Sequence, residues 1–538
     1  MSGHRFDGVD ALTIGLWLAC SVFVLLPIAS ILLLAGSGNQ LSVLLQGDVI
    51  EAGINSLVSA STSALLAVVI GTAFAIMLDR TDLTGRTPLR LLALSPLLIP
   101  PFVGAIAWLG VAGPTSPVNL WWRQTFGAPL WSIYGADGVI LLLTVHSYPI
   151  AMLIVSAALR RIPTDLEQAA RIGGAGLGRA IATITVPLLR PALMSSFILI
   201  AVSNLADFGI PSIIGLPERY VTLATLVYRY LQSGIVDEPL AVVATIGVVL
   251  LVLAVLALIA DALLGRKKWE LDSSAAVIER LPLGHARTPL GVLTWIVVLT
   301  VTVLPLLALL TQTLLRAPGV PLTWENLTFD HLIRAVTSAN ALTGAANSMM
   351  LASLAALICG VLGLGIGVVI TRARSKTTSG LGAVAMVPQA VPGIVIAVAW
   401  LVLAPSLGLF NTPWLILVAY VTSFTALVVQ AVSAPLASTP VSAEEAARVA
   451  GAGRLRALMD ISCRMSLPAA VSGMVIVAVT AVRELTLSVL LLSPGSQTLG
   501  VAIFNFQQAG AFSTASAWSL IVAVLGIAVI GIATRRTS

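Results

Sequence analysis

Residues 239–265 read PLAVVATIGVVLLVLAVLALIADALLG, an apolar run with one charged residue, Asp261. A helix needs about 20 apolar residues to cross a bilayer, so a run this long with few charges is typical of a membrane-spanning helix. Eleven more such runs lie near residues 12–36, 53–78, 88–112, 138–159, 188–208, 291–315, 346–371, 381–404, 414–435, 469–493 and 513–534. We therefore expect an all-α integral membrane protein with about 12 transmembrane helices.

The composition agrees with a membrane protein. The 538-residue chain is 58% hydrophobic and only 10% charged, whereas soluble proteins carry about 25% charged residues. The three cysteines are not spaced like a disulfide framework or a zinc site. The sequence contains no paired carboxylates, metal-spaced histidines or nucleophile motif. It therefore predicts no catalytic residue and no metal site.

The basic residues predict the orientation in the membrane. If the N-terminus is cytoplasmic, most of the 29 Lys and Arg residues fall in cytoplasmic segments, as the positive-inside rule requires. A missed span would invert this bias downstream, and no inversion occurs. We therefore expect both termini in the cytoplasm. Orientation also accounts for the net charge of +6, so no nucleic-acid partner is predicted.

The chain is built from two copies of one unit. Asn55-Ser56 and Asn347-Ser348 are 292 residues apart, and the same offset relates Pro96, Pro100 and Trp108 to Pro388, Pro392 and Trp400. The expected organisation is a first six-helix unit over 1–265, a cytoplasmic linker over 266–290 and a second six-helix unit over 291–538. Because each unit has an even number of spans, the repeats are parallel, and a transport pathway is expected at their pseudo-two-fold interface.

Two cytoplasmic loops carry a shared pattern. Residues 166–175 read LEQAARIGGA, and residues 443–452 read AEEAARVAGA. Each is expected to begin a short helix with acidic residues in its first turn, where the helix dipole favours them, and a glycine positioned to end it in a left-handed conformation. One copy alone would fit an amphipathic helix on the membrane surface. Two copies at equivalent places favour a docking element.

These loops resemble the EAA signature of type I ABC importer permeases: Glu-Ala-Ala, three residues, Gly, nine residues and Ile-x-Leu-Pro. The first loop, near 164–187, matches with Gln168 at the Glu position, then Ala169, Ala170, Gly174 and Ile184-Thr185-Val186-Pro187. The second, near 440–468, matches with Glu445, Ala446, Ala447, Gly451 and Ile461. Glu167 is a candidate substitute for the charge that Gln168 lacks. Pro468 falls four residues late, which predicts a different exit into the eleventh span.

The resemblance implies a type I ABC importer fold and a permease, not an enzyme. In that family each EAA helix is a coupling helix on a separate ABC ATPase, present in two copies. The ATPase holds ATP and magnesium, so this chain is expected to bind no cofactor. A periplasmic or lipid-anchored solute-binding protein would deliver the cargo to the bacterial inner (plasma) membrane. The fused form looks most like ferric iron permeases, with thiamine and organophosphonate permeases as alternatives.

Charged residues inside spans are costly and mark functional candidates. Asp207, late in the fifth run, and Glu484, late in the eleventh, are 277 residues apart and therefore repeat equivalents. They are candidate pathway or gate residues that could attract a cation such as ferric iron, a hard ion that prefers oxygen ligands. Alternatively, they form helix-end contacts, with Arg483 neutralising Glu484.

Proline pairs interrupt the third and ninth runs. Pro100 and Pro392, with Pro96 and Pro388, remove helical hydrogen bonds, which is tolerated only where the break is buried. They are candidate gate residues, and a static kink is the alternative. His146, in the fourth run, is expected to be a hydrogen-bonded interhelical residue. Asn55 and Asn347 are expected to cap the second and eighth spans.

A proton-coupled secondary transporter of the major facilitator type is the main rival. It too has twelve spans in two parallel halves, and Asp79-Arg80 to Arg86 partly matches its loop signature. The spacing to Gly85 is too long, and the paired EAA loops stay unexplained. The chain also lacks a G-x-x-x-x-G-K-[S/T] motif, so it has no P-loop of its own.

Overall fold

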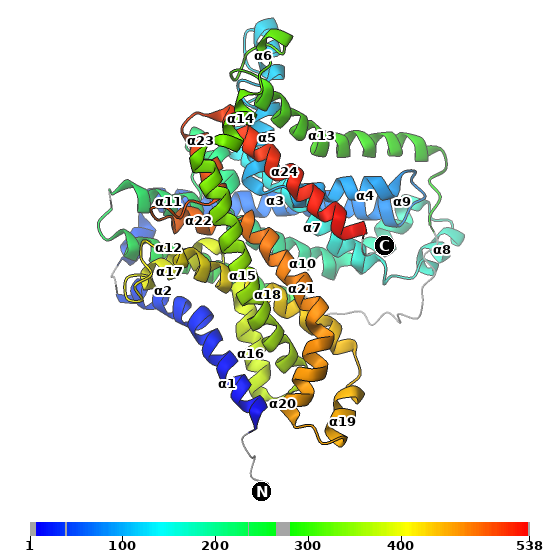
Figure 1. Ribbon diagram of the computed structural model, residues 1–538. Coiled ribbons are helices and arrows are strands. Elements are labelled where there is room, and N and C mark those ends of the chain that lie inside the picture. The colour runs from blue at the N-terminus through cyan, green and yellow to red at the C-terminus, as the bar shows by residue number, and fades with distance from the viewer. Residues whose placement is uncertain (1–6, 38–39, 235, 265–279, 536–538) are drawn as a thin grey trace. The chain divides into compact units, whose positions relative to one another are not determined.

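The computed structural model describes residues 7–37, 40–234, 236–264 and 280–535, which form 24 α-helices and no β-strand (Figure 1). The first half contains α1 (Gly8–Cys20), α2 (Leu26–Ser37), α3 (Gly47–Asp79), α4 (Arg86–Leu94), α5 (Pro101–Ala112), α6 (Pro117–Phe126), α7 (Ala136–Leu159), α8 (Asp165–Ile172), α9 (Leu177–Ala180), α10 (Val186–Leu205), α11 (Leu223–Ser233) and α12 (Pro239–Leu264). The second contains α13 (Arg287–Leu314), α14 (Asp330–Thr337), α15 (Ala339–Arg372), α16 (Lys376–Met386), α17 (Gly393–Leu403), α18 (Trp414–Ser438), α19 (Ser442–Val449), α20 (Arg454–Ala457), α21 (Arg464–Val482), α22 (Thr486–Leu490), α23 (Leu499–Gln508) and α24 (Phe512–Arg535).

Nine of the described helical segments are long and apolar enough to cross a bilayer. They are Gly8–Ser37, Gly47–Asp79, Ala136–Leu159, Leu177–Leu205, Pro239–Asp261, Gly284–Leu314, Ala339–Arg372, Trp414–Ser438 and Arg454–Val482. Two bent pairs bring the number to as many as eleven, and the last expected run forms α24. The expected all-α membrane architecture is therefore confirmed.

The two bent spans are the third and the ninth. The segment Arg86–Leu98 meets Pro101–Phe126 at 107°, and Lys376–Gln389 meets Gly393–Leu403 at 103°. The residue before a proline is pushed out of the helical region, and Ile99 is accordingly extended before Pro100. Pro100 and Pro392 then begin the second half of each span as N-caps. The sharp breaks thus fall at Pro100 and Pro392, whereas the residues before Pro96 and Pro388 keep helical backbone angles.

The fifth and eleventh spans end earlier than expected. They run over Leu177–Leu205 and Arg454–Val482, so Asp207 and Glu484 lie beyond the helix ends. In each span a π-type turn follows the first four residues, over Ile181–Thr185 in the first copy and Leu458–Cys463 in the second. The two exits from the EAA loops are therefore alike, and the different exit predicted from Pro468 is wrong.

Asn55 and Asn347 do not cap helices, because α3 and α15 begin eight residues before them. The Asn55 amide instead donates to the Val221 carbonyl, and the Asn347 amide donates to the Gly495 and Gln497 carbonyls. The serine that follows each asparagine also makes an equivalent hydrogen bond in the two copies. The Ser56 hydroxyl accepts the Leu223 N–H at 2.8 Å, and the Ser348 hydroxyl accepts the Leu499 N–H at 2.8 Å.

Contacts divide the chain into two compact units, each of which mixes the repeats. One unit holds Met1–Gln46, Val227–Val252 and Ser338–Ala502. The other holds Gly47–Leu226, Leu253–Thr337 and Ile503–Ser538. Each unit therefore joins the middle spans of one repeat to end spans of the other. The halves 1–265 and 291–538 therefore describe the repeat in the sequence and do not correspond to the two compact units.

Each unit contains an equivalent trio of packed helices: α3, α7 and α10 in one, and α15, α18 and α21 in the other (Figure 1). Small residues allow the close approach that membrane helices need. A Cβ atom at Gly71 would lie 2.6 Å from the Tyr148 carbonyl oxygen, and one at Gly363 would lie 2.5 Å from Val428 Cβ. These trios hold the loops that carry the candidate site.

Candidate functional site

Both EAA loops form the expected short helix. Helix α8 has Asp165 and Glu167 in its first turn and Arg171 in its last, and α19 has Glu444 and Glu445 followed by Arg448. Both patterns place charges where the helix dipole favours them. Each helix follows a long span directly, α7 in the first copy and α18 in the second.

The glycines end the two helices in the same way. Gly174 has φ +90° and Gly451 has φ +93°, the left-handed region where a side chain is strained. The N–H of Ala175 donates to the Ala170 carbonyl, and the N–H of Gly174 donates to the Arg171 carbonyl. Gly451 and Ala452 repeat these bonds in the second copy. This pattern is the Schellman motif, so the left-handed cap predicted from the sequence is confirmed.

The two helices expose an apolar residue at equivalent positions. Ile172 is 89% exposed and Val449 is 90% exposed. Ala169 and Ala446 are exposed beside them, and Glu445 is exposed as well. Ile172 and Val449 were not among the residues predicted from the sequence, although their offset of 277 residues relates them. An almost fully exposed aliphatic side chain beside small residues is suited to packing against the surface of a partner protein.

Glu167 does not face outward. Its side chain is fully buried, its carboxylate lies 3.6 Å from Nε of the equally buried Arg80, and it accepts a hydrogen bond from the Thr185 hydroxyl. Arg80 also donates to the carbonyls of Leu159 and Ile162, at the end of α7. Glu167 therefore cannot substitute at the surface for the charge that Gln168 lacks.

Burial lowers the pKa of the Arg80 guanidinium from its ordinary value, and the nearby carboxylates of Glu167 and Asp79 oppose that shift. An arginine starts so far above neutrality that it keeps its charge. The contact between Arg80 and Glu167 is therefore an ion pair held away from water.

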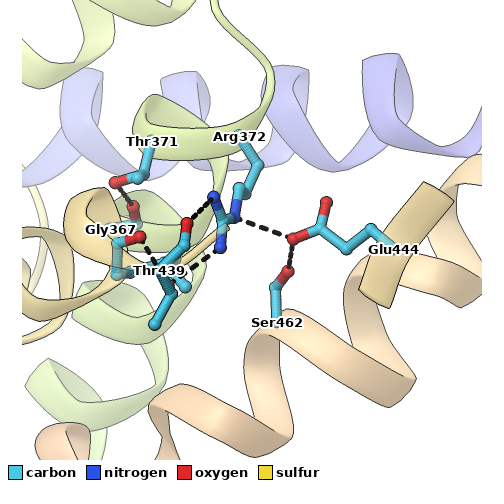
Figure 2. Close-up of polar contacts among 7 residues, drawn as sticks. Gly367, Thr371, Arg372, Thr439, Glu444 and Ser462 are labelled. Atoms are coloured by element: carbon cyan, nitrogen blue, oxygen red, sulfur yellow. Dashed lines mark hydrogen bonds and ion pairs between the residues drawn. The ribbon is translucent and has the colours of Figure 1, made fainter. Parts of the chain in front are cut away.

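The second copy repeats this arrangement with Glu444, one residue before the Glu of the motif (Figure 2). Its carboxylate lies 2.8 Å from Nε of Arg372 and accepts a hydrogen bond from the Ser462 hydroxyl. Arg372 also donates to the carbonyl and the hydroxyl of Thr439, at the end of α18. Figure 2 shows Arg372 reaching both partners.

We call these two groups the anchor clusters: Arg80, Glu167 and Thr185 in the first copy, and Arg372, Glu444 and Ser462 in the second. Of these residues, only Glu167 was predicted from the sequence to have a role in coupling. The repeat contains the signal, because the arginines are 292 residues apart and the other two pairs are 277 apart. A buried ion pair could not be read from that spacing alone.

The end of the linker packs beside the first anchor cluster. Residues 266–279 lie outside the described residues, but Leu281 is buried and exchanges backbone hydrogen bonds with Arg80 and Asp82. The Asp82 carboxylate accepts the Leu283 N–H and pairs with Arg287 at 3.8 Å. Leu281 therefore fixes this end of the predicted linker to the first unit, while residues 284–289 are exposed to solvent.

Asp207 and Glu484 occupy equivalent places at the start of the next helical turn. The Asp207 carboxylate accepts the Ile210 N–H at 2.9 Å, and the Glu484 carboxylate accepts the Leu487 N–H at 2.9 Å. Each thus caps a helix N-terminus, as acidic residues commonly do. The two carboxylates lie in different compact units.

His146 lies at the break in the third span. Its Nε2 is 2.7 Å from the Ile99 carbonyl oxygen, next to Pro100, and Gly104 packs against its ring. That carbonyl loses its helical partner at the break, so the histidine satisfies it. The expected hydrogen-bonded interhelical role is confirmed.

This fold, in which two repeats of membrane spans each carry one short exposed helix, is that of a transport permease. The match to a known family agrees: residues 67–270 and 361–536 match the family described as the binding-protein-dependent transport system inner membrane component. The chain belongs to this family, whose members are multi-pass membrane subunits of ABC transporters and not enzymes. Membership implies partners such as an ATPase and a binding protein, and it sets aside the major facilitator alternative.

Named relatives cover much of the chain. The ferric transport system permease protein FbpB of Actinobacillus pleuropneumoniae is 25% identical over 91% of this chain and 71% of its own length. The Fe(3+)-transport system permease protein FbpB 2 of Haemophilus influenzae is 23% identical over 85% of this chain and 84% of its own. The molybdenum transport system permease protein ModB of Escherichia coli is 29% identical, but over 34% of this chain and 80% of its own.

Proposed function

We propose that this chain is the membrane permease of an ATP-driven importer, with α8 and α19 as coupling helices on two copies of a separate ABC ATPase. The observation that carries the proposal is the duplicated helix itself. Both copies have acidic residues in the first turn, a left-handed glycine at the end and an exposed aliphatic side chain at the equivalent position. A surface repeated in this way fits two identical partners.

The distribution of basic residues supports an orientation in the bacterial inner membrane with both termini in the cytoplasm. The coupling helices then face the ATPase subunits, which bind ATP and magnesium. A periplasmic or lipid-anchored binding protein delivers the solute on the opposite side.

Ferric iron is the proposed cargo. The relatives that cover most of the chain carry ferric iron in their names, whereas the molybdenum relative matches about a third of it. Thiamine and organophosphonates are the remaining candidates. Uptake of radioactive ferric iron, compared with radioactive molybdate, in cells with and without the gene tests this choice. Molybdate uptake without iron uptake would replace the proposed cargo.

We further propose that Asp207, Glu484 and Arg483 are gate residues of the pathway, together with Pro100 and Pro392 at the broken spans. The capping bonds of both carboxylates support a role in helix geometry. Asp207→Asn combined with Glu484→Gln keeps side-chain size and removes both charges. Unchanged iron uptake in this variant would limit the two residues to capping.

The coupling surface is tested with the tagged chain purified from its own host in mild detergent. We expect an ABC ATPase to accompany it, at two copies per permease. Ile172→Asp with Val449→Asp should abolish this association without disturbing the fold, because both side chains are about nine-tenths exposed. Trp324→Asp, at an equally exposed residue between α13 and α14, is the matched control. A chain that purifies alone and transports with the proton gradient would refute the proposal.

A further inference from the structure

The anchor clusters attach each coupling helix to its transmembrane helices through ion pairs and hydrogen bonds. In the first copy, Arg80 follows α3, Glu167 lies on α8, and Thr185 ends the π-type turn that leads into α10. The same guanidinium holds two carbonyls at the end of α7. One arginine thus connects α3, α7 and α8, and the glutamate extends the connection to α10.

The second copy makes the same connection with different residues around it. Arg372 is the last residue of α15, Glu444 lies on α19, and Ser462 lies in the π-type turn before α21. Arg372 holds Thr439 at the end of α18. Serine replaces threonine, but a hydroxyl that donates to the carboxylate is kept. Chemistry preserved at three equivalent positions of a diverged repeat indicates a shared role.

Burial makes this connection strong. The Arg80 and Glu167 side chains are 1% and 0% exposed, and those of Arg372 and Glu444 are 6% and 14% exposed. An exposed ion pair contributes little, but separating a buried pair strands a charge away from water. A displacement of α8 or α19 should therefore move the ends of the attached spans before the ion pair separates.

Direct contact of these glutamates with a partner is the alternative role. The burial of Glu167 excludes it for the first copy, because no part of that carboxylate reaches the surface. The neighbouring motif position is the one that faces outward, as the exposed Glu445 shows in the second copy. The two adjacent residues thus have separate roles: one faces inward to the spans and the other faces outward.

We propose that the anchor clusters are the joints that transmit movement of the coupling helices to the spans, with Arg80, Glu167, Thr185, Arg372, Glu444 and Ser462 as positioning residues. This inference rests on the proposed function, in which the ATPase moves α8 and α19. Loss of a cluster should leave an ATPase bound to a helix that no longer moves the spans.

The first test is hydrogen–deuterium exchange of the purified full-length chain. Glu167→Gln keeps the side-chain size and removes the ion pair. Amides of residues 165–172 should exchange about tenfold faster, as expected when a charge-assisted hydrogen bond is lost. Residues 442–449 provide an internal control and should not change. Glu444→Gln should give the mirror result. Unchanged exchange in the helix that carries the substitution would overturn the inference, whether or not the ATPase binds.

The second test is transport by the complex of the chain with its ATPase and binding protein in proteoliposomes, with ferric iron as the probe. In Glu167→Gln, iron imported per ATP hydrolysed should fall about tenfold, while hydrolysis per assembled complex stays within about twofold. Asp460→Asn is the matched control, since it removes a carboxylate from an exposed arginine pair. If iron imported per ATP is unchanged, the clusters only stabilise the fold and the inference is wrong.

The double variant Arg80→Gln with Glu167→Gln separates stability from coupling. It leaves no unpaired buried charge, so it should recover the yield and melting temperature that Glu167→Gln loses. It should not recover iron imported per ATP. Recovery of both quantities would show that the single variant failed through instability. If the wild-type chain purifies without an ATPase, the proposed function is refuted. The exchange test would still show whether the ion pair attaches α8 to the spans.

Discussion

Replacing Gly174 by alanine tests how the first coupling helix is terminated. Gly174 has φ +90°, and a Cβ atom there would meet nothing within 4 Å. The cost of the substitution is therefore conformational and not steric. An L-residue in the left-handed region costs about 1–2 kcal/mol, and alanine recovers about 0.4–1 kcal/mol by restricting the unfolded chain. The net destabilisation of the helix end is about 1 kcal/mol, or about fivefold in its local opening.

Hydrogen–deuterium exchange of the full-length chain in detergent measures this opening. Peptides covering residues 165–175 should exchange about fivefold faster in Gly174→Ala. Gly176→Ala is the matched control, because Gly176 has φ −64° and equally open surroundings. It should leave the exchange of residues 165–175 unchanged, because alanine adopts this backbone conformation without strain. Gly451→Ala and Gly453→Ala form the corresponding pair in the second copy. Equal exchange in Gly174→Ala and Gly176→Ala would refute the role of the left-handed cap.

Three further substitutions test contacts described above. Ser56→Ala leaves the buried N–H of Leu223 without its acceptor and should destabilise the purified chain by about 1–3 kcal/mol, measured as a lower melting temperature, whereas an unchanged value would contradict the role of Ser56. His146→Ala should lower the melting temperature and His146→Gln should lower it less, because glutamine can still donate to the Ile99 carbonyl; equal losses would exclude that bond as the cause. Asp82→Ala releases the packed end of the linker, so trypsin should cut after Arg280 severalfold faster, and an unchanged rate would show that Asp82 does not hold it.

Features that are local along the chain could be predicted from the amino-acid sequence. A span is a continuous apolar run, so residues 239–265 and the other runs could be recognised without knowing their neighbours. The repeat offsets and the EAA pattern are also linear, and they led directly to α8, α19 and the left-handed glycines. Pro100 and Pro392 predicted breaks for the same reason, since proline acts on its own backbone.

Contacts between residues that are far apart in the sequence could be identified only from the tertiary structure. The sequence predicted Glu167 to be a surface charge, but its partner is the buried Arg80, which lies 87 residues earlier in the chain. Asn55 matched a capping residue by type, but its partner is the Val221 carbonyl. The packing of end spans from one repeat with the middle spans of the other likewise could not be predicted from the sequence of either repeat. Apolar periodicity records that a residue is buried, but not against which neighbour, because the hydrophobic effect is non-directional and only packing selects the partner.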